Sequence, residues 1–424
     1  MGKKDHTEKI NTFIRKIICY TNRKYQGVNM HADFKHTDFL NDFIARFKNS
    51  TEKIHVFRSP ARINLIGEHI DYNGGKVFPA AIDRYLSMAI RLRDDDTINI
   101  QNQDIQGSWS FTIPQFHEKP SEASWISYLR GVFHYLFNGK WPDRGFDALF
   151  TSNVPMGAGV SSSAALELCF AYGLSWLYKL EIPRLDLVHI SRKAEHEYAG
   201  VHCGIMDQYA VAFGKAEHAL LLDTSACTHT YAPVKLGDYV IMLINTNKPR
   251  SLADSKYNER LEECQKALTL LRTIPTLSQC QNLCDIPPDQ FEQHKAILNN
   301  ATLERRVRHC IYENQRVLAS VDVLNKGDLK AFGKLLIESH ISLRENYEVT
   351  GLHLDTIFES ARSYADCIGV RMTGAGFGGC AIALIKKTAL DDFARTVGSD
   401  YKSKTGLEAT FYPVTIGEGV HELE

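Results

Sequence analysis

Polar side chains gather directly after an apolar, strand-like run in the segment Arg62–Gly75, which reads RINLIGEHIDYNGG. Glu68, His69 and Asp71 follow the run almost without a break, and Gly74–Gly75 end it. Together these side chains offer several hydrogen-bond donors and acceptors where a buried strand reaches the surface. Such an edge can select a polyhydroxylated ligand, because the wrong ligand leaves a needed hydrogen bond unmade.

A second segment, Pro155–Glu167, reads PMGAGVSSSAALE and combines a glycine-rich turn with the predicted start of a helix. The first N–H groups of a helix lack intrahelical partners and carry partial positive charge, so they attract phosphate. Gly157 and Gly159 let a phosphate approach the backbone, and Ser161–Ser163 add hydroxyl groups. No Gly-Lys-Ser/Thr closes the loop, which excludes a Walker A motif. A serine-rich helix cap after a turn is the simpler alternative.

A third segment, Lys193–Ala210, brings two carboxylates, Glu195 and Asp207, to the ends of consecutive predicted helices. His196 and His202 are six residues apart, so the spacing is not that of a helical zinc motif. Two carboxylates near a phosphate loop are suited to Mg²⁺ binding and to a catalytic aspartate. A solvated surface pair is the alternative for either carboxylate taken alone.

The fourth segment, Met372–Ile385, reads MTGAGFGGCAIALI and satisfies the pattern GxGxxG. A dinucleotide-binding fold needs a helix after this pattern, whereas the residues that follow it here are strand-like. The glycines therefore predict either a tight connection between two strands or a bridge that packs against a ligand or another loop. Taken together, the polar edge, the phosphate loop and the carboxylates indicate a small-molecule kinase.

Hydrophobic periodicity predicts the elements that position these segments. A change from strand-like to helix-like patterns near residue 160, and back again later, predicts an α+β fold of two domains with a boundary near 230–238. The strands of the first part are expected to be antiparallel. Predicted helices span 36–49, 162–179, 184–199, 252–271 and one or two segments in 301–348; predicted strands span 54–67, 76–82, 85–93, 97–103, 108–113, 148–155, 218–224, 238–246, 369–374 and 380–385.

Bulk composition fits a globular protein of 424 residues with a hydrophobic core, since 44% of the residues are hydrophobic and 23% are charged. The formal net charge of -1 gives no electrostatic signature for nucleic acid or an anionic membrane. Ten cysteines without a CxxC pair predict free thiols in a reducing cytoplasm. No apolar run is long enough for a membrane-spanning helix, and residues 1–33 are expected to be a basic extension rather than a signal peptide.

In combination, these segments resemble the galactokinase family of the GHMP kinase superfamily. RINLIGEHIDYNGG resembles its sugar-binding signature, PMGAGVSSSAALE its phosphate loop and MTGAGFGGC its third motif. Further similar segments are CGIMDQ, SKYNER, RRVRHCIYEN and SHISLRENYEVT. The resemblance runs from about residue 34 to the C-terminus. It implies the two-domain GHMP kinase fold, with domains at 34–232 and 233–424 and an active site in the cleft between them.

The resemblance also implies an activity and roles for particular residues. The expected reaction transfers the γ-phosphoryl group of ATP to the C1 hydroxyl of α-D-galactose, giving galactose 1-phosphate for the Leloir pathway. Mg²⁺ is the implied cofactor, and we expect a cytoplasmic monomer. The implied roles are catalysis for Asp207 and Arg62; sugar binding for Glu68, His69, Asp71, Gly204 and Tyr257; nucleotide binding for Gly157, Ala158, Gly159, Val160, Ser161, Ser162 and Ser163; and metal binding for Ser163 and Glu195.

Two mechanisms stay open for the implied catalytic pair. Asp207 accepts the hydroxyl proton late in the reaction, with Arg62 keeping it ionised, or Arg62 stabilises the transferring group and Asp207 only orients the sugar. The sequence departs from the usual signature at Ala61, where glycine is common, and at Ile70, where threonine is commoner. Alternatives are therefore a kinase for N-acetylgalactosamine, galacturonate or arabinose, or a non-catalytic galactose sensor. The intact serine loop argues against the sensor, and the intact motifs argue against a ligand-free structural protein.

Overall fold

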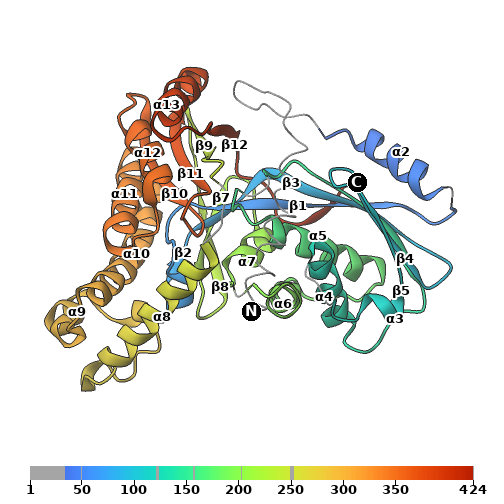
Figure 1. The fold of residues 1–424 in the computed structure, drawn as a ribbon, viewed down its shortest axis with the longest axis horizontal. Coiled ribbons are helices and arrows are strands. Elements are labelled where there is room, and N and C mark those ends of the chain that lie inside the picture. The colour runs from blue at the N-terminus through green and yellow to red at the C-terminus, as the bar shows by residue number, and fades with distance from the viewer. Residues whose placement is uncertain are drawn as a thin grey trace.

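The structure is a computed structural model that describes residues 34–48, 50–120, 124–155, 158–201, 203–248 and 253–423. The predicted N-terminal extension 1–33 lies outside these residues. Within the described parts, strands and helices mix without strict alternation, which confirms the predicted α+β class (Figure 1).

A six-stranded sheet forms the framework of the first half, in the order β13-β1-β3-β6-β4-β5. Its strands are β1 (His55–Asn64), β3 (Pro79–Leu92), β4 (Thr97–Asn102), β5 (Ser108–Thr112), β6 (Phe146–Ser152) and β13 (His421–Leu423). Because β13 pairs with β1, the end of the chain returns to the first sheet.

Two expectations about these strands were wrong. Segments 76–82 and 85–93 were predicted as separate strands, but β3 runs continuously through Asp83 and Arg84. The polar pair lies opposite a β-bulge between Pro60 and Ala61, so the strand bends there without ending. The sheet is also not wholly antiparallel, since β4 pairs with β6 in parallel. A crossover through α3 (Ile113–Phe116) and α4 (Trp125–Phe137) makes the parallel pairing possible.

Helices cover both faces of this sheet (Figure 1). On one face lie α4, α5 (Ser162–Leu177), α6 (Arg184–Ala194) and α7 (Met206–Phe213). On the other face, α2 (His36–Phe47) packs Phe39 and Phe43 against Val56 of β1, while the neighbouring Phe57 joins the main core. This alternation is the period of two expected when each face of a strand is buried.

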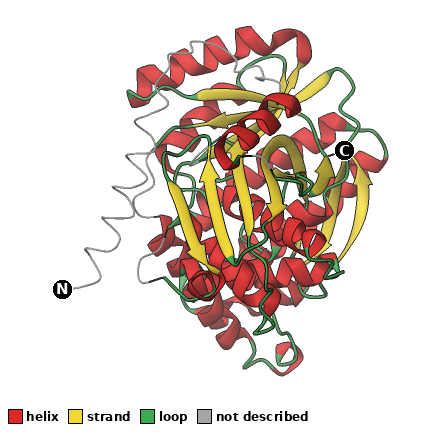
Figure 2. Ribbon diagram, turned by 90° about the vertical axis from the view of Figure 1, so that its right-hand side faces the viewer, coloured by secondary structure: helices red, strands yellow, loops and turns green. Residues whose placement is uncertain are grey.

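The second half places helices along a four-stranded antiparallel sheet of order β10-β11-β9-β12 (Figure 1). Figure 2 shows the helices and strands of the molecule from the right-hand side of Figure 1. Its strands are β9 (Tyr239–Asn245), β10 (Cys367–Thr373), β11 (Cys380–Lys386) and β12 (Thr410–Val414). Its helices are α8 (Ala253–Leu271), α9 (Pro288–His294), α10 (Ala301–Asn325), α11 (Leu329–Ser342), α12 (Gly351–Arg362) and α13 (Leu390–Thr405). A three-stranded sheet of β2 (Lys76–Val77), β7 (His218–Asp223) and β8 (Thr228–Pro233) completes the fold.

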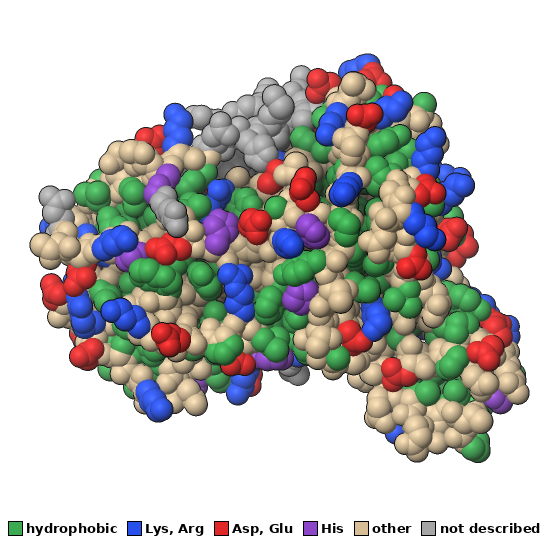
Figure 3. Space-filling model, turned by 180° about the vertical axis from the view of Figure 1, so that it is seen from behind, with side chains coloured by type: hydrophobic (Ala, Val, Ile, Leu, Met, Phe, Trp, Pro, Cys, Tyr) green, Lys and Arg blue, Asp and Glu red, His purple; other side chains and the backbone are tan. Residues whose placement is uncertain are grey.

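The surface carries no broad field of one charge on the face seen in Figure 3, where basic and acidic side chains alternate. This agrees with the near-neutral net charge of -1. Among the residues that the structure describes, no helix is both long and apolar enough to cross a membrane.

Candidate active site

An arginine and an aspartate form the centre of the candidate site. Arg62 lies in the buried second part of β1, and Asp207 lies in the first turn of α7. The guanidinium donates two parallel hydrogen bonds, from Nε to Asp207 Oδ1 at 2.8 Å and from Nη2 to Asp207 Oδ2 at 2.8 Å. Such a bidentate pair fixes both side chains in one orientation.

The surroundings of this pair stabilise and orient the Arg62 guanidinium. Burial disfavours the charge of Arg62, but the Asp207 carboxylate offsets it and raises the pKa of the guanidinium above its usual range. The third guanidinium nitrogen, Nη1, donates to the carbonyl oxygen of Gly159 at 2.9 Å. The Asp207 side chain stays 25% exposed, so a substrate hydroxyl has room to reach its carboxylate.

The phosphate loop lies directly beside the pair. Ser161 adopts a left-handed backbone conformation, with φ of 61°, and its hydroxyl donates to Asp207 rather than capping α5. A simple serine helix cap therefore does not describe this residue. Ala158, Gly159 and Val160 lead into the helix, Ser162 is exposed, and the predicted Gly157 lies outside the described residues.

The glycine bridge between β10 and β11 packs against this loop. A Cβ atom on Gly374 would lie 3.0 Å from the carbonyl oxygen of Gly159, and Gly374 has φ of 87°. The strand β11 follows the glycines, which confirms the predicted strand and excludes the helix that a dinucleotide-binding fold needs there. Of the alternatives for this segment, the bridge that packs against another loop is the one observed.

A second carboxylate, Glu195, faces the start of α5 from a π-helical turn, Glu195–Ala199, that Gly200 ends in a left-handed conformation. The Glu195 side chain is buried and hydrogen-bonded to Ser163, Cys203 and Gln208. Burial raises its pKa. Interruptions of this kind in a helix recur at functional sites.

Ser163 and Glu195 fit a magnesium ion as two oxygen ligands that already touch each other. Mg²⁺ in nucleotide sites usually takes one or two protein oxygens and completes its shell with phosphate and water. The neighbouring Asp207 carboxylate disfavours the charge on Glu195, and a cation there would relieve that repulsion. No cluster of three or more His, Cys, Asp or Glu suited to a metal occurs among the described residues.

The polar edge predicted to bind a sugar is held by residues from the second half of the chain. Glu68 is buried and accepts hydrogen bonds from the Gly374 N–H at 2.7 Å and from Asn64 Nδ2 at 3.0 Å. Arg371 lies 3.5 Å from the same carboxylate. Burial still raises the pKa of Glu68, although Arg371 counteracts the effect.

His69 adopts a left-handed conformation with φ of 63° and contacts aromatic residues. Its Nδ1 lies 2.8 Å from the Tyr72 hydroxyl and its Nε2 lies 3.2 Å from the carbonyl oxygen of Ala375. Burial lowers the pKa of His69 to about 3, so the ring is neutral at pH 7. Tyr257 joins the cluster, with its ring centre 5.7 Å from that of His69.

Asp71 lies against bare backbone. A Cβ atom on Gly204 would lie only 1.8 Å from Asp71 Oδ2, so the carboxylate needs glycine at this position. Burial, with Asp207 and Glu68 nearby, raises the pKa of Asp71 to about 7. The structure thus brings together Asp71 and Gly204, which were predicted to bind the sugar and lie on separate segments of the chain.

Sequence reasoning missed the residues that support these groups. Arg371, next to the third motif, also donates to the carbonyl oxygens of Asn64 and Leu65. His309 and Glu313 bond the backbone of Glu68 and Gly67, respectively. A signal existed, since these residues sit inside the motifs GVRMTG and RRVRHCIYEN. The motifs alone do not say which side chains turn inward.

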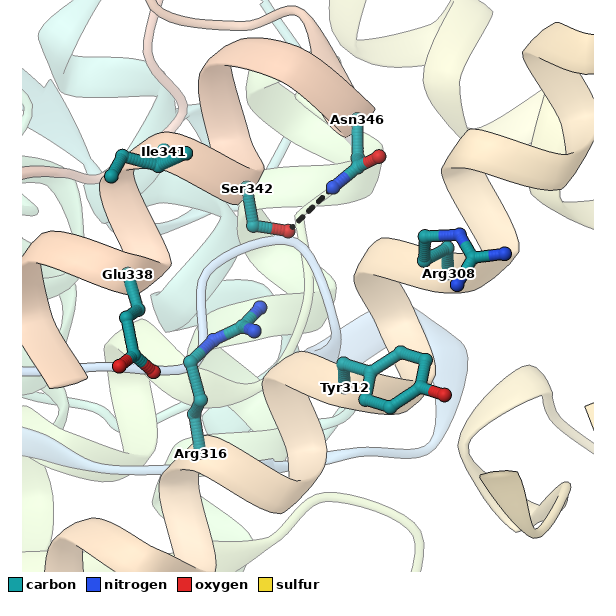
Figure 4. Close-up of a pocket in the computed structure, with 7 residues that line it drawn as sticks. All are labelled: Arg308, Tyr312, Arg316, Glu338, Ile341, Ser342 and Asn346. Carbon is teal, nitrogen blue, oxygen red and sulfur yellow. Dashed lines mark hydrogen bonds between the residues drawn. The ribbon is translucent and has the colours of Figure 1, made fainter. Parts of the chain in front are cut away.

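A hollow of about 380 Å³ lies behind the polar edge and contains none of the predicted site residues (Figure 4). Its lining residues are Arg308, Tyr312, Arg316, Glu338, Ile341, Ser342 and Asn346. Ser342 Oγ lies 2.9 Å from His309 Nδ1, and Arg316 donates to Glu313 at 2.7 Å. The wall of this hollow is therefore one residue removed from the backbone of the sugar-binding segment.

The departures from the usual signature are accommodated. Ala61 lies in β1 and is not among the residues with positive φ, so its methyl group causes no strain. The Ile70 side chain is fully buried and occupies the space beside Gly75, where a Cβ would lie 2.7 Å from it. Its methyl groups thus face the core.

Comparison with known families first defines the class of protein. Models of the GHMP kinase N-terminal and C-terminal domains match residues 127–215 and 320–403. A mevalonate kinase structure from Methanococcus jannaschii superposes with a TM-score of 0.61 at 17% identity, covering 87% of this chain and all of that one. At that identity the likeness concerns the fold alone. The chain has the GHMP kinase fold.

Closer relatives define the family. The galactokinase galactose-binding signature matches residues 41–92. The chain is 45% identical to a galactokinase of Enterococcus faecalis over 86% of its length and 94% of the relative's. It is 44% identical to that of Lactiplantibacillus plantarum, with 91% and 99% covered. The structure of Lactococcus lactis galactokinase complexed with galactose has a TM-score of 0.86 at 40% identity, covering 91% of this chain and 99% of that one. This chain belongs to the galactokinase family.

Proposed function

We propose that this protein is a galactokinase, which transfers the γ-phosphoryl group of ATP to the C1 hydroxyl of α-D-galactose. The observation that carries the proposal is the Arg62–Asp207 pair, which bonds the phosphate loop through Gly159 and Ser161. The Asp71 carboxylate, set against Gly204, lies on the sugar side of the same pair. A phosphate donor and a hydroxyl acceptor would meet there.

In this proposal Asp207 accepts the proton of the sugar hydroxyl as the new bond to phosphorus forms. A free aspartate has a pKa of about 3.9, so it cannot remove that proton in advance. Arg62 orients the carboxylate through two hydrogen bonds and places positive charge beside the transferring group. The transition state of phosphoryl transfer is loose, and positioning with charge neutralisation supplies most of the catalysis.

Ser163 and Glu195 would hold Mg²⁺, which neutralises phosphate charge when it is bound. The N–H groups at the start of α5 would take the remaining phosphate oxygens, because they have no helical partners. Gly157–Ser163 form the proposed nucleotide site. The Glu195 carboxylate is buried, and hydrogen bonds from Cys203 and Gln208 fix its orientation.

The sugar would be held by Glu68, His69, Asp71, Gly204 and Tyr257. Both carboxylate oxygens of Glu68 accept hydrogen bonds from the protein. In this proposal Glu68 therefore fixes the backbone of the sugar-binding segment, and it also faces the sugar. Neutral His69 can donate or accept one hydrogen bond without a charge. We also propose a boundary between domains near residue 233, a monomeric state and a cytoplasmic location; the last rests on nine free cysteines in the described residues.

The first test is an ADP-release assay with purified protein, ATP and Mg²⁺. The panel would be galactose, N-acetylgalactosamine, galacturonate, arabinose, glucose and mevalonate. We expect galactose to have the highest kcat/KM. A higher kcat/KM for another sugar would keep the reaction but refute the substrate. Galactose binding without ADP release from any sugar would refute the enzyme and favour a sensor.

A further inference from the structure

A buried glutamate and a buried glutamine lie behind the proposed metal ligand, and neither contacts a substrate in the reaction described above. Glu167 lies on α5, one turn after Ser163, and Gln208 follows Asp207 on α7. Both side chains have 0% exposure. A polar side chain buried this completely normally has partners for all its polar atoms.

One atom links three side chains. Gln208 Nε2 donates to Glu195 Oε2 at 2.5 Å and to Glu167 Oε2 at 3.2 Å. An amide nitrogen carries two hydrogens, so these two bonds to oxygen use both, and Cys203 Sγ lies further from Nε2, at 3.7 Å. Gln208 therefore ties the carboxylate of Glu167 to that of Glu195.

The two remaining oxygens are unpartnered. Within the described part of the chain, Glu167 Oε1 and Gln208 Oε1 are buried and accept no hydrogen bond. They belong to two side chains that already touch through their other polar atoms. An ionised carboxylate and an amide oxygen are both acceptors only, so neither can satisfy the other.

A single proton between these two oxygens would give both of them a hydrogen-bond partner. A carboxylic acid and a primary amide can form a closed pair, in which the amide N–H donates to one carboxyl oxygen and the acid O–H donates to the amide oxygen. The first of these bonds is present, and the two unpartnered oxygens are the atoms that the second would join. The alternative is a buried anion with one oxygen unpaired, which is costly.

The groups around Glu167 favour the neutral acid. The titratable groups that face this cluster are Glu195, Asp207 and the Cys203 thiol, and none of the three is a cation. Burial and the Glu195 carboxylate raise the pKa of Glu167 well above its usual range. The nearby cation, Arg62, is already paired with Asp207.

We propose that Glu167 is a protonated positioning residue, which locks the Gln208 amide and through it fixes the orientation of the metal ligand Glu195. The proton stays on Glu167, and no bond to substrate forms or breaks at this residue. The effect on Glu195 rests on the proposed function, whereas the acid–amide pair stands on the hydrogen-bond geometry alone.

The first test reads the proton itself in metal-free, nucleotide-free protein. The infrared difference spectrum between wild type and Glu167→Gln at neutral pH should contain the carbonyl stretch of a protonated carboxyl group. Other protonated carboxyls, such as Asp71, cancel in the difference. Absence of the band, with both proteins folded, would overturn the proposal. This readout needs no catalytic activity.

The second test reads the effect on the metal. Mg²⁺ binding in the presence of ADP would be measured by calorimetry, without sugar. Glu167→Gln keeps one donor and one acceptor towards Gln208, so we expect its Mg²⁺ affinity to stay within about threefold of wild type. Glu167→Leu leaves the amide unpaired, and we expect a loss of about 10- to 100-fold, typical of residues that orient a metal ligand.

Two further measurements separate positioning from general damage. Galactose affinity without nucleotide should be equal in wild type and in both Glu167 variants, because the sugar edge does not contact Glu167. If Glu167→Leu does not fold, Gln208→Leu takes its place with the same expected loss of Mg²⁺ affinity. Equal Mg²⁺ affinity in wild type and in the folded leucine variant would overturn the positioning role. Failure of the galactokinase assay would leave both binding readouts interpretable.

Discussion

The two sides of the candidate site are built from different parts of the chain. On the transfer side, Arg62 and Asp207 are hydrogen-bonded to each other, and all the other partners of Arg62, Asp207 and Glu195 described above lie between residues 159 and 208 of the first half. On the sugar side, Glu68 and His69 are bonded to Gly374, Ala375 and His309 of the second half. The catalytic groups are thus assembled within one half, whereas the sugar edge depends on contact between the halves.

The electrostatics differ in the same way. The transfer side keeps its central charges by pairing them, with Arg62 and Asp207 joined by two hydrogen bonds of 2.8 Å. The sugar side suppresses charge, since burial keeps His69 neutral and raises the pKa of Asp71 to about 7. A paired charge is suited to a charged phosphoryl group, and neutral donors and acceptors are suited to hydroxyls. Variants should therefore separate turnover from sugar affinity.

The largest effect is expected from Asp207→Asn. The amide keeps the size of the side chain but removes the proton acceptor and the charge that pairs with Arg62. We expect kcat to fall by about 10³-fold, within the range usual for loss of a general base. Galactose affinity, measured by calorimetry without nucleotide, should change by less than about threefold.

Arg62→Ala is the matched variant for the other mechanism. If Arg62 has the larger share, its kcat falls further than that of Asp207→Asn. Unchanged turnover in both folded variants would show that the pair is not the catalytic centre.

The next effect concerns stability and tests the dependence on the second half. Arg371 is fully buried, donates to the carbonyl oxygens of Asn64 at 2.9 Å and Leu65 at 3.1 Å, and compensates Glu68. Arg371→Met leaves Glu68 as an unpaired buried carboxylate, so we expect a loss of about 3–5 kcal/mol in the free energy of unfolding. Denaturant unfolding measures it.

A control and a rescue accompany this variant. Arg362 is a surface arginine of the same half, with 42% exposure and Glu359 at 3.5 Å, and Arg362→Met should cost less than about 1 kcal/mol. The double variant Arg371→Met with Glu68→Gln should recover part of the loss, because the unpaired charge is gone. Equal losses in the single and double variants would refute the proposed role of Arg371.

The segments that form the two sides of the site were predictable from sequence, but the long-range contacts that hold them in place were not. The helix start at the serines, Asp207 at the start of a helix and the strand after MTGAGFGGC were all predicted and observed. Motif spacing fixes such features because they are local. The fusion of two predicted strands into β3 was missed, since the bulge at Pro60/Ala61 depends on pairing with a distant strand. Glu167 and Gln208 were missed for the same reason: their meaning comes from a contact between two helices.

A pH effect separates the suppressed charge of the sugar side from the paired charge of the transfer side. The pKa of Asp71 is about 7 in the folded protein, above its ordinary value of 3.8. Below about pH 4 the residue is protonated in both states, so its contribution to stability is fully present there. As pH rises from about 4 to 7, the unfolded chain loses the proton first and the contribution is lost, by about 1.4 kcal/mol per pH unit.

Asp71→Asn removes this titration and keeps the shape of the protonated form. Its stability relative to wild type should therefore rise between about pH 4 and pH 7 and stay level above that range. Unfolding curves at several pH values, without sugar, measure the difference. A difference independent of pH would show that Asp71 is not buried beside the other carboxylates as described.

The smallest effect is expected at Gly204, where the sugar side meets the segment that carries Asp207. The backbone of Gly204 lies beside the Asp71 carboxylate, and a Cβ there would meet Oδ2 at 1.8 Å. Gly204→Ala must displace Asp71 and weaken one hydrogen bond to the sugar, so we expect KM for galactose to rise about tenfold. Because Arg62 and Asp207 do not contact Gly204, kcat at saturating galactose should fall less than about threefold.

Gly398→Ala on α13, where the nearest atom to a Cβ is on the Phe411 ring at 3.2 Å, is the control for an added methyl group. A variant at 204 that loses kcat and keeps KM would place Asp71 on the transfer side and remove the division between the two sides.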